Sequence, residues 1–192
     1  MKTDIILAGV GGQGILSIAT IIGNAALKEN LYMKQAEVHG MSQRGGDVQS
    51  CLRISSRPVA SDLIPAGAAD LIVSLEPMEA LRYVEYLKPD GWIVTNTVPV
   101  VNIPNYPEGE VLMAELRSHK NVIAFDMDSV AREVASPRSS NMVLLGACAQ
   151  LTGLPTEGIE AAISVVFSRK GERIVESNIA AFRAGLARAN GA

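Results

Sequence analysis

A cluster of glycines after a short apolar segment constrains the start of this chain more than any other feature. Residues 4–10 are almost entirely apolar and run straight into Gly9-Val10-Gly11-Gly12-Gln13-Gly14, which satisfies the pattern G-x-G-x-x-G. From residue 12 to about residue 28, apolar side chains recur at helical spacing. A glycine run between a strand and a helix is typical of a Rossmann-like fold, and we expect the chain to begin in that way.

The rest of the chain alternates strand and helix patterns before it becomes purely helical. Apolar strand patterns cover residues 31–38, 47–54, 70–75, 91–96 and 121–126, and helical patterns cover residues 77–87, 128–135, 141–152, 156–168 and 172–189. Residues 96–109 contain three prolines and are expected to form a surface excursion. This alternation predicts an α/β fold, a three-layer sandwich in which helices cover both faces of a mainly parallel sheet, with a helical C-terminal third. The whole chain, residues 1–192, fits a single domain.

The glycine loop has two interpretations that the sequence leaves open. Glycines let a ligand approach backbone N–H groups, and the start of the following helix carries a partial positive charge suited to phosphate. On this interpretation Gly9, Gly11, Gly12, Gln13 and Gly14 bind an anionic cofactor. Alternatively, the glycines only allow the strand and the helix to pack closely.

Residues 37–46 form a second segment with many reactive side chains. A carboxylate, an imidazole, a hydroxyl, an amide and a guanidinium are provided by Glu37, His39, Ser42, Gln43 and Arg44. Residues 39–46 include three glycines and are expected to form a loop, and loops on a rigid sheet commonly carry binding groups. The planar guanidinium of Arg44 suits phosphate, so we expect Ser42 and Arg44 to join the glycine loop in binding a ligand if the first two strands are neighbours. A solvated turn in which Arg44 pairs with Glu37 is the alternative.

Composition and charge restrict the partners and the compartment. The net charge of −3 provides no electrostatic attraction for nucleic acid or for an anionic membrane. No apolar run approaches the roughly 20 residues of a membrane helix, and the N-terminus lacks the pattern of a signal peptide. The two cysteines, Cys51 and Cys148, cannot form a disulfide framework. We therefore expect a soluble cytoplasmic protein that binds neither nucleic acid nor membrane.

The sequence lacks the motifs of the common catalytic cofactors. It has no set of cysteines for an iron–sulfur cluster, no cluster of histidines and cysteines for zinc, and no G-x-x-x-x-G-K-[ST] phosphate loop. The Gly46-Asp47 step lacks the downstream asparagines of a thiamine diphosphate and magnesium motif, and serine or cysteine nucleophile signatures are missing. We therefore predict no catalytic residue, no metal ligand and no cofactor bound by the chain alone.

Three segments together resemble one family. They are the glycine run of residues 9–14, the polar segment of residues 37–46, and residues 141–147 near the C-terminus. In order and spacing they are similar to the gamma-type domain of 2-oxoacid:ferredoxin oxidoreductases. The middle segment most resembles the indolepyruvate branch of that family, in its beta subunit. The resemblance covers nearly the whole chain and implies a non-catalytic small subunit.

The resemblance also implies partners and cofactors. The large catalytic subunit would carry thiamine diphosphate, magnesium and iron–sulfur clusters, and the complex would convert arylpyruvates such as indolepyruvate to acyl-CoA while reducing ferredoxin. Coenzyme A would be a shared ligand, because this domain lies near its entrance in related enzymes, where residues 11–14 and Arg44 would meet a phosphate. The preferred 2-oxoacid and the stoichiometry of the complex are not specified.

A rival function and a partner surface complete the expectations. The rival is a stand-alone NAD, flavin or nucleotide-binding Rossmann-like protein, which needs only the glycine loop and an acidic residue near the end of the second strand, such as Glu37. The partner surface is expected in the C-terminal third, which has more apolar residues than one sheet face needs. The residues expected to contribute to it are Ile163, Val166, Phe167, Ile179 and Phe182.

Overall fold

A computed structural model describes residues 1–39 and 45–191 of the chain. Within them, six strands form one sheet in the order β2-β3-β1-β4-β5-β6. The strands are β1 (Lys2–Val10), β2 (Tyr32–His39), β3 (Asp47–Ser55), β4 (Ala69–Ser74), β5 (Leu87–Asn96) and β6 (Val122–Phe125). Strands β1, β4, β5 and β6 run parallel, whereas β3 is antiparallel to both of its neighbours. The prediction of a mainly parallel sheet is therefore confirmed.

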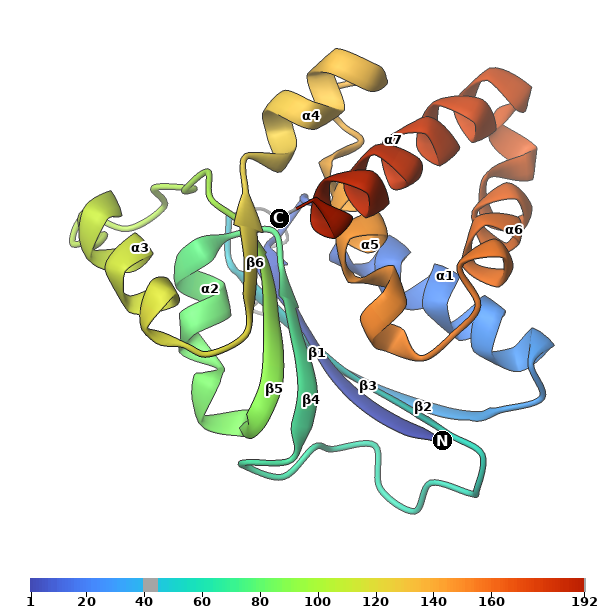
Figure 1. The fold of residues 1–192 in the computed structure, drawn as a ribbon, viewed down its shortest axis with the longest axis horizontal. Helices are drawn as coiled ribbons and strands as arrows, with labels where there is room; N and C mark the ends of the chain where they lie inside the picture. The colour runs from blue at the N-terminus through green and yellow to red at the C-terminus, as the bar shows by residue number, and fades with distance from the viewer. Residues whose placement is uncertain (40–44, 192) are drawn as a thin grey trace.

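The helices form a layer on each face of this sheet (Figure 1). One layer holds α2 (Pro77–Arg82), the short turn η1 (Val84–Tyr86) and α3 (Gly109–Ser118). The other holds α1 (Ile15–Lys28), α5 (Ser140–Cys148), α6 (Thr156–Phe167) and α7 (Glu172–Asn190), with the turns η2 (Ala149–Thr152) and η3 (Ser168–Lys170) between them. Helix α4 (Met127–Val134) follows β6 and contacts α5 and α7. The three layers and the helical C-terminal third agree with the prediction.

Successive residues of the central strands point into two separate cores. Ile5 and Leu7 of β1 pack against the larger helical layer, whereas Ile6 and Ala8 pack on the side of α2 and α3. All four side chains are buried. Because both faces of the sheet are covered, β1 has a continuous apolar sequence instead of the alternation of a half-exposed strand.

The structure contains one helix that the sequence does not predict, and one strand that begins earlier than predicted. Helix α3 lies where no helix is predicted, because it buries only Leu112 and Leu116 and so has a narrow apolar stripe. Strand β5 begins at Leu87 instead of residue 91, and the predicted helix over residues 77–87 is accordingly split into α2 and η1. The first part of β5 is polar, which hides it from a pattern search: Pro89 and Asp90 are exposed.

The residues named for an apolar partner surface in the C-terminal third lie in or against the core, so the choice of these residues is wrong and the surface itself stays a prediction. Ile163, Phe167 and Phe182 are buried in the main core, and Val166 and Ile179 are partly buried against it. Helices α6 and α7 pack on each other and on α1 and α5, so they need apolar residues on more than one side. Of the helices described, none is both long enough and apolar enough to cross a membrane.

Candidate functional site

The glycine loop lies at the carboxyl ends of the parallel strands, where open α/β folds place ligands. Strand β1 ends at Val10 and α1 begins at Ile15, so the loop is the direct connection between them. Gly12 and Gly14 have φ angles of 101° and 87°, in the left-handed region that favours glycine. No atom lies within 4 Å of the position that a Cβ on Gly12 would take. The loop is therefore open to a ligand at Gly12.

Gly9 and Gln13 hold the loop in place. The N–H of Val10 donates to Oε1 of Gln13 over 2.7 Å, and Nε2 of Gln13 donates to the carbonyl oxygen of Leu75 over 3.1 Å. A Cβ on Gly9 would stand 2.9 Å from that same Oε1 and from Cγ1 of Ile15. Both ends of the Gln13 amide are thus used to join the end of β1 to the end of β4, and Gly9 leaves room for it. Gln13 would serve a ligand by positioning the loop.

The two segments predicted to share a ligand meet through backbone hydrogen bonds. The N–H of Gly11 donates to the carbonyl oxygen of Gly46 over 2.7 Å, and the N–H of Gly45 donates to that of Gly11 over 3.3 Å. The sequence predicts that the two segments meet because β1 and β2 are neighbours. In the structure β1 and β2 are not neighbours, because β3 lies between them. The loops meet because β3 returns beside β1, where Val10 pairs with Asp47.

Part of the predicted site lies outside the described residues. Ser42 and Arg44 fall in the segment 40–44, so their contribution to ligand binding stays a prediction. The structure fixes only where that segment is attached. Strand β2 ends at His39, and the described chain resumes at Gly45, beside the glycine loop and two residues before β3 begins at Asp47.

The strand order does not fit the dinucleotide interpretation. In a Rossmann site the acidic residue that holds the ribose stands at the end of the strand next to β1. Here Glu37 lies on the edge strand β2 and pairs with Ser50 of β3. Two strand spacings of about 4.8 Å each therefore separate its strand from β1. Glu37 is displaced from the position that a bound NAD or flavin dinucleotide requires.

The proline-containing excursion packs at the same edge of the sheet. Glu76, which follows β4 and is fully buried, accepts hydrogen bonds from the hydroxyl of Tyr106 and from the N–H of Val100, the latter over 3.3 Å. Nδ2 of Asn102 donates to the carbonyl oxygen of Gly45 over 2.8 Å. Burial and the hydrogen bond to Glu76 raise the pKa of Tyr106, so its phenol remains a donor at neutral pH. These bonds fix the excursion against the loop that adjoins the glycines.

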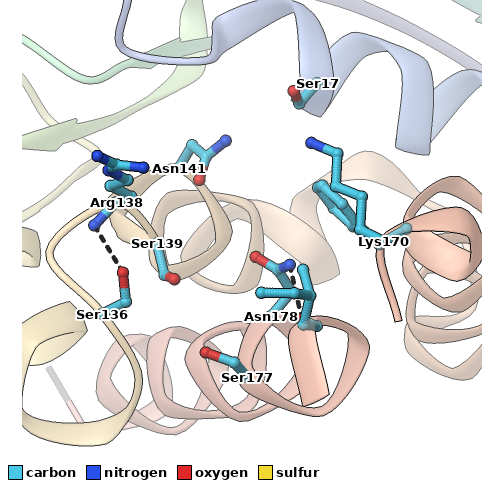
Figure 2. Close-up of a pocket in the computed structure, with 10 residues that line it drawn as sticks. Ser17, Ser136, Arg138, Ser139, Asn141, Lys170, Ser177 and Asn178 are labelled. Atoms are coloured by element: carbon cyan, nitrogen blue, oxygen red, sulfur yellow. Dashed lines mark hydrogen bonds between the residues drawn. The ribbon is translucent and has the colours of Figure 1, made fainter. Parts of the chain in front are cut away.

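Asn141 joins the third of the resembling segments to the first. Its Nδ2 donates to the carbonyl oxygen of Gly14 over 3.3 Å, so the start of α5 lies against the start of α1. Asn141 and Ser17 also line a pocket of about 450 Å³ beside the glycine loop (Figure 2). Arg138 and Lys170 line the same pocket, although no motif in the sequence marks either residue. The available signal was the serine-rich turn at residues 136–140, typical of a helix start.

Metal-binding and thiol groups play no visible part at this edge. In residues 1–39 and 45–191, no three histidine, cysteine, aspartate or glutamate side chains gather so that they could hold a metal ion. Cys51 and Cys148 are buried and free. Burial raises the pKa of Cys148 to about 12, which keeps the thiol protonated at neutral pH. The absence of a catalytic residue stays a prediction.

The fold, the glycine loop and the segments that meet around it define a class of protein. Residues 4–188 match the sequence profile of pyruvate ferredoxin/flavodoxin oxidoreductases, and the chain belongs to this family. It is 36% identical over 193 residues to the indolepyruvate oxidoreductase subunit IorB of Methanothermobacter thermautotrophicus, with 97% of each chain covered. It is 37% identical over 191 residues to the subunit of the same name in Pyrococcus horikoshii, covering 95% of this chain and 94% of that one.

A solved structure supports the same assignment. The 2-oxoglutarate:ferredoxin oxidoreductase of Magnetococcus marinus, with 2-oxoglutarate, coenzyme A and succinyl-CoA bound, matches with a TM-score of 0.77 and 25% identity. The match covers 100% of this chain and 31% of that one. The resemblance to the family of 2-oxoacid:ferredoxin oxidoreductases is therefore confirmed. In the Magnetococcus enzyme the corresponding fold is one part of a longer polypeptide.

Proposed function

We propose that the chain is the small, non-catalytic subunit of an indolepyruvate-type 2-oxoacid:ferredoxin oxidoreductase. The observation that carries this proposal is the correspondence, over nearly the full length of both chains, with subunits named for indolepyruvate oxidoreductase. The described parts of the three resembling segments lie at one sheet edge and are joined by hydrogen bonds, which supports it further. The two buried, free cysteines suit a reducing cytoplasm.

In the proposed complex the redox chemistry belongs to the large subunit. Thiamine diphosphate, held there with magnesium, would supply the carbanion stabilisation that decarboxylation needs, and iron–sulfur clusters would carry the electrons. The bond between the carboxylate and the keto carbon would break with loss of carbon dioxide, the acyl group would form a thioester with coenzyme A, and the thiol proton would be released. The electron pair passes to ferredoxin one electron at a time.

We place a phosphate of coenzyme A at the glycine loop of this chain. Gly12 leaves the loop open, and α1 follows Gly14 with no acidic residue in its first turn, so the partial positive charge of the helix start is not offset there. Arg44 would reach the same phosphate from the segment tied to the loop through Gly45 and Gly11. The Magnetococcus relative binds coenzyme A, which makes this ligand the first to test.

A pull-down from the native host tests the subunit assignment. The tagged chain should capture a large polypeptide that contains thiamine diphosphate and iron, whereas the isolated chain should be colourless and inactive. Stoichiometric iron or flavin in the isolated chain would contradict the assignment. So would a rise of several degrees in its melting temperature with NAD that is lost in Glu37→Ala, because a ligand of the folded state stabilises it by mass action.

Steady-state kinetics of the assembled enzyme test the coenzyme A site. Arg44→Ala should raise the apparent KM for coenzyme A by roughly 10- to 150-fold, the equivalent of one charge-assisted hydrogen bond. The KM for the arylpyruvate should not change, because that substrate reacts on the partner. Arg188→Ala, which removes the same charge from the exposed end of α7, is the matched control. An unchanged KM for coenzyme A in Arg44→Ala would show that Arg44 is not part of the site. A variant that only fails to assemble with the large subunit would show the same.

A further inference from the structure

The pocket beside Gly14 gathers polar groups from segments that are far apart in the sequence. Ser17 comes from α1, Arg138 and Ser139 from the turn before α5, Lys170 from η3, and Ser177 from α7. Figure 2 shows these side chains around a common space, with Arg138 and Lys170 on opposite sides. The space measures about 450 Å³, within the range of small-molecule sites and larger than one phosphate needs.

The charge of this pocket is positive and is not neutralised by the fold. No aspartate or glutamate is among the described residues that line it. Within residues 1–39 and 45–191, neither Arg138 nor Lys170 forms an ion pair with a carboxylate. The ammonium of Lys170 stands over the ring of Phe167, 5.2 Å from its centroid, which orients the charge without neutralising it.

A hydroxyl that faces the pocket is available to a ligand. Ser139 is only 5% exposed, and its side chain does not cap α5. Figure 2 shows its oxygen directed into the pocket. Among the described residues, only Nε2 of His119 is a buried polar side-chain atom without a hydrogen-bond partner, so the oxygen of Ser139 is reached by solvent from the pocket. A ligand in the pocket can therefore accept a hydrogen bond from Ser139.

The helix starts add to the preference for an anion. Ser139 is the residue before α5, a helix of 9 residues, and Ser177 lies in the second turn of α7. Ser17 lies in the first turn of α1. Helix N-termini carry partial positive charge, and neither α1 nor α5 has an acidic residue in its first turn, so the beginnings of these two helices act in the same direction as Arg138 and Lys170. In α7, Glu172 in the first turn offsets that charge.

We propose that this pocket binds the phosphate monoester of a nucleotide-type ligand. Arg138 and Lys170 balance the charge of the phosphate, and the hydroxyl of Ser139 donates a hydrogen bond to it. The remaining volume accommodates part of the nucleoside. The inference concerns the affinity of this pocket and stands apart from the proposed function, since neither Arg44 nor the large subunit takes part in it.

Calorimetric titration of the full chain, alone or purified with its large subunit, tests this site with AMP, inorganic phosphate, coenzyme A and 3′-dephospho-coenzyme A. Arg138→Ala should raise the Kd for AMP by at least about tenfold, as expected for a lost charge-assisted bond. Ser139→Ala should raise it by about two- to tenfold. Ser139→Ala should leave the melting temperature without ligand unchanged, because the hydroxyl does not cap α5 and makes no hydrogen bond to the described residues. Arg188→Ala should leave the Kd within about twofold of the wild type, since an exposed charge outside the pocket is largely screened.

The ligands distinguish the source of the phosphate. Tighter binding of coenzyme A than of its 3′-dephospho form, with the difference abolished by Arg138→Ala, would identify the 3′-phosphate of coenzyme A. Equal binding of AMP and coenzyme A would identify a site for nucleotide phosphomonoesters in general. Wild-type affinity in both Arg138→Ala and Lys170→Ala would overturn the proposal. An equal loss in Arg188→Ala, or no binding of AMP or coenzyme A at millimolar concentration, would also overturn it.

Discussion

Asn141 at the start of α5 donates a hydrogen bond from Nδ2 to the carbonyl oxygen of Gly14, over 3.3 Å and across 127 positions of the chain. This bond joins two of the segments by which the chain resembles its family. It also sets the position of α5 beside the glycine loop, and so helps to form the pocket lined by Arg138 and Lys170. The conformation of the loop and the shape of the pocket therefore depend on each other.

Gly14→Ala should destabilise the protein more than Gly12→Ala. Both glycines have positive φ angles, so alanine costs about 1–2 kcal/mol of backbone strain at either position. Only at Gly14 would the new Cβ meet another group, Nδ2 of Asn141 at 2.6 Å, whereas the space at Gly12 is open. Urea unfolding of the two variants gives the comparison. Equal losses of stability would show that Asn141 does not press on the loop.

At Gly146 of α5 and Gly185 of α7, the backbones of the two helices approach each other closely. A Cβ on Gly146 would overlap the backbone carbonyl of Phe182, and one on Gly185 would overlap that of Val143. Gly146→Ala and Gly185→Ala should each lower the free energy of unfolding by at least about 1–3 kcal/mol, because the helices must separate. Urea unfolding of each variant measures the loss.

Gly158→Ala is the matched control for this helix pair. The nearest atoms to its Cβ would lie 3.8 Å away, and it stands near the start of α6. Here alanine should be neutral or stabilise by up to about 1 kcal/mol, since glycine is a poor helix former. If alanine at Gly146 or Gly185 changed the free energy of unfolding no more than alanine at Gly158 does, the close approach of α5 and α7 would be contradicted.

The elements that the sequence predicts well are those with local signals. The apolar run of β1 and the glycines after it specify their conformations within a few residues, and the helical periodicity of α1 and α7 is equally local. The position of β3 between β1 and β2 is a pairing between distant segments, and no residue pattern marks it. For the same reason Glu37 looks suitable for a dinucleotide in the sequence but stands on the wrong strand in the fold.

The pocket could not be predicted because its parts come together only through helix packing. Arg138 and Lys170 are separated in sequence by α5 and α6, and they face each other because Gly146 and Gly185 let α5 and α7 pack closely. The sequence shows that the C-terminal third is rich in apolar residues, but it does not show whether another helix or a second subunit covers them. In the structure, helices cover Ile163 and Phe182.

The ion pair of Asp4 with Arg53 should make stability depend on acidic pH. Arg53 donates to both oxygens of the buried carboxylate, over 2.8 and 3.0 Å, and Nζ of Lys2 lies 2.8 Å from one of them. Burial alone would raise the pKa of Asp4, but the hydrogen bonds from Arg53 and Lys2 outweigh it and hold the pKa below its ordinary value. A pKa lower in the folded than in the unfolded state contributes stability above the unfolded pKa of about 3.9. That contribution is lost as the pH falls through the folded pKa.

Urea unfolding between pH 7 and pH 3 measures this dependence. Arg53→Ala should lower the free energy of unfolding at pH 7 by about 3 kcal/mol, at the low end for a broken buried pair because Lys2 still reaches Asp4. Asp4→Asn should have a lower free energy of unfolding at pH 7, and that free energy should fall less steeply than in the wild type as the pH is lowered. Arg57→Ala, on an exposed neighbour, should match the wild type. If the free energy of unfolding of Asp4→Asn fell as steeply with decreasing pH as that of the wild type, the carboxylate of Asp4 would not be the cause of the pH dependence.

The most direct test of the central claim is the rate of ferredoxin reduction by the reconstituted complex. The assay contains indolepyruvate and coenzyme A, and compares the large subunit alone, this chain alone, and the two together. We predict no activity from this chain alone, and a rate from the complex that the large subunit alone does not reach. A rate from the large subunit that is unchanged by adding this chain, or ferredoxin reduction by this chain alone, would contradict its role as a non-catalytic subunit of the enzyme.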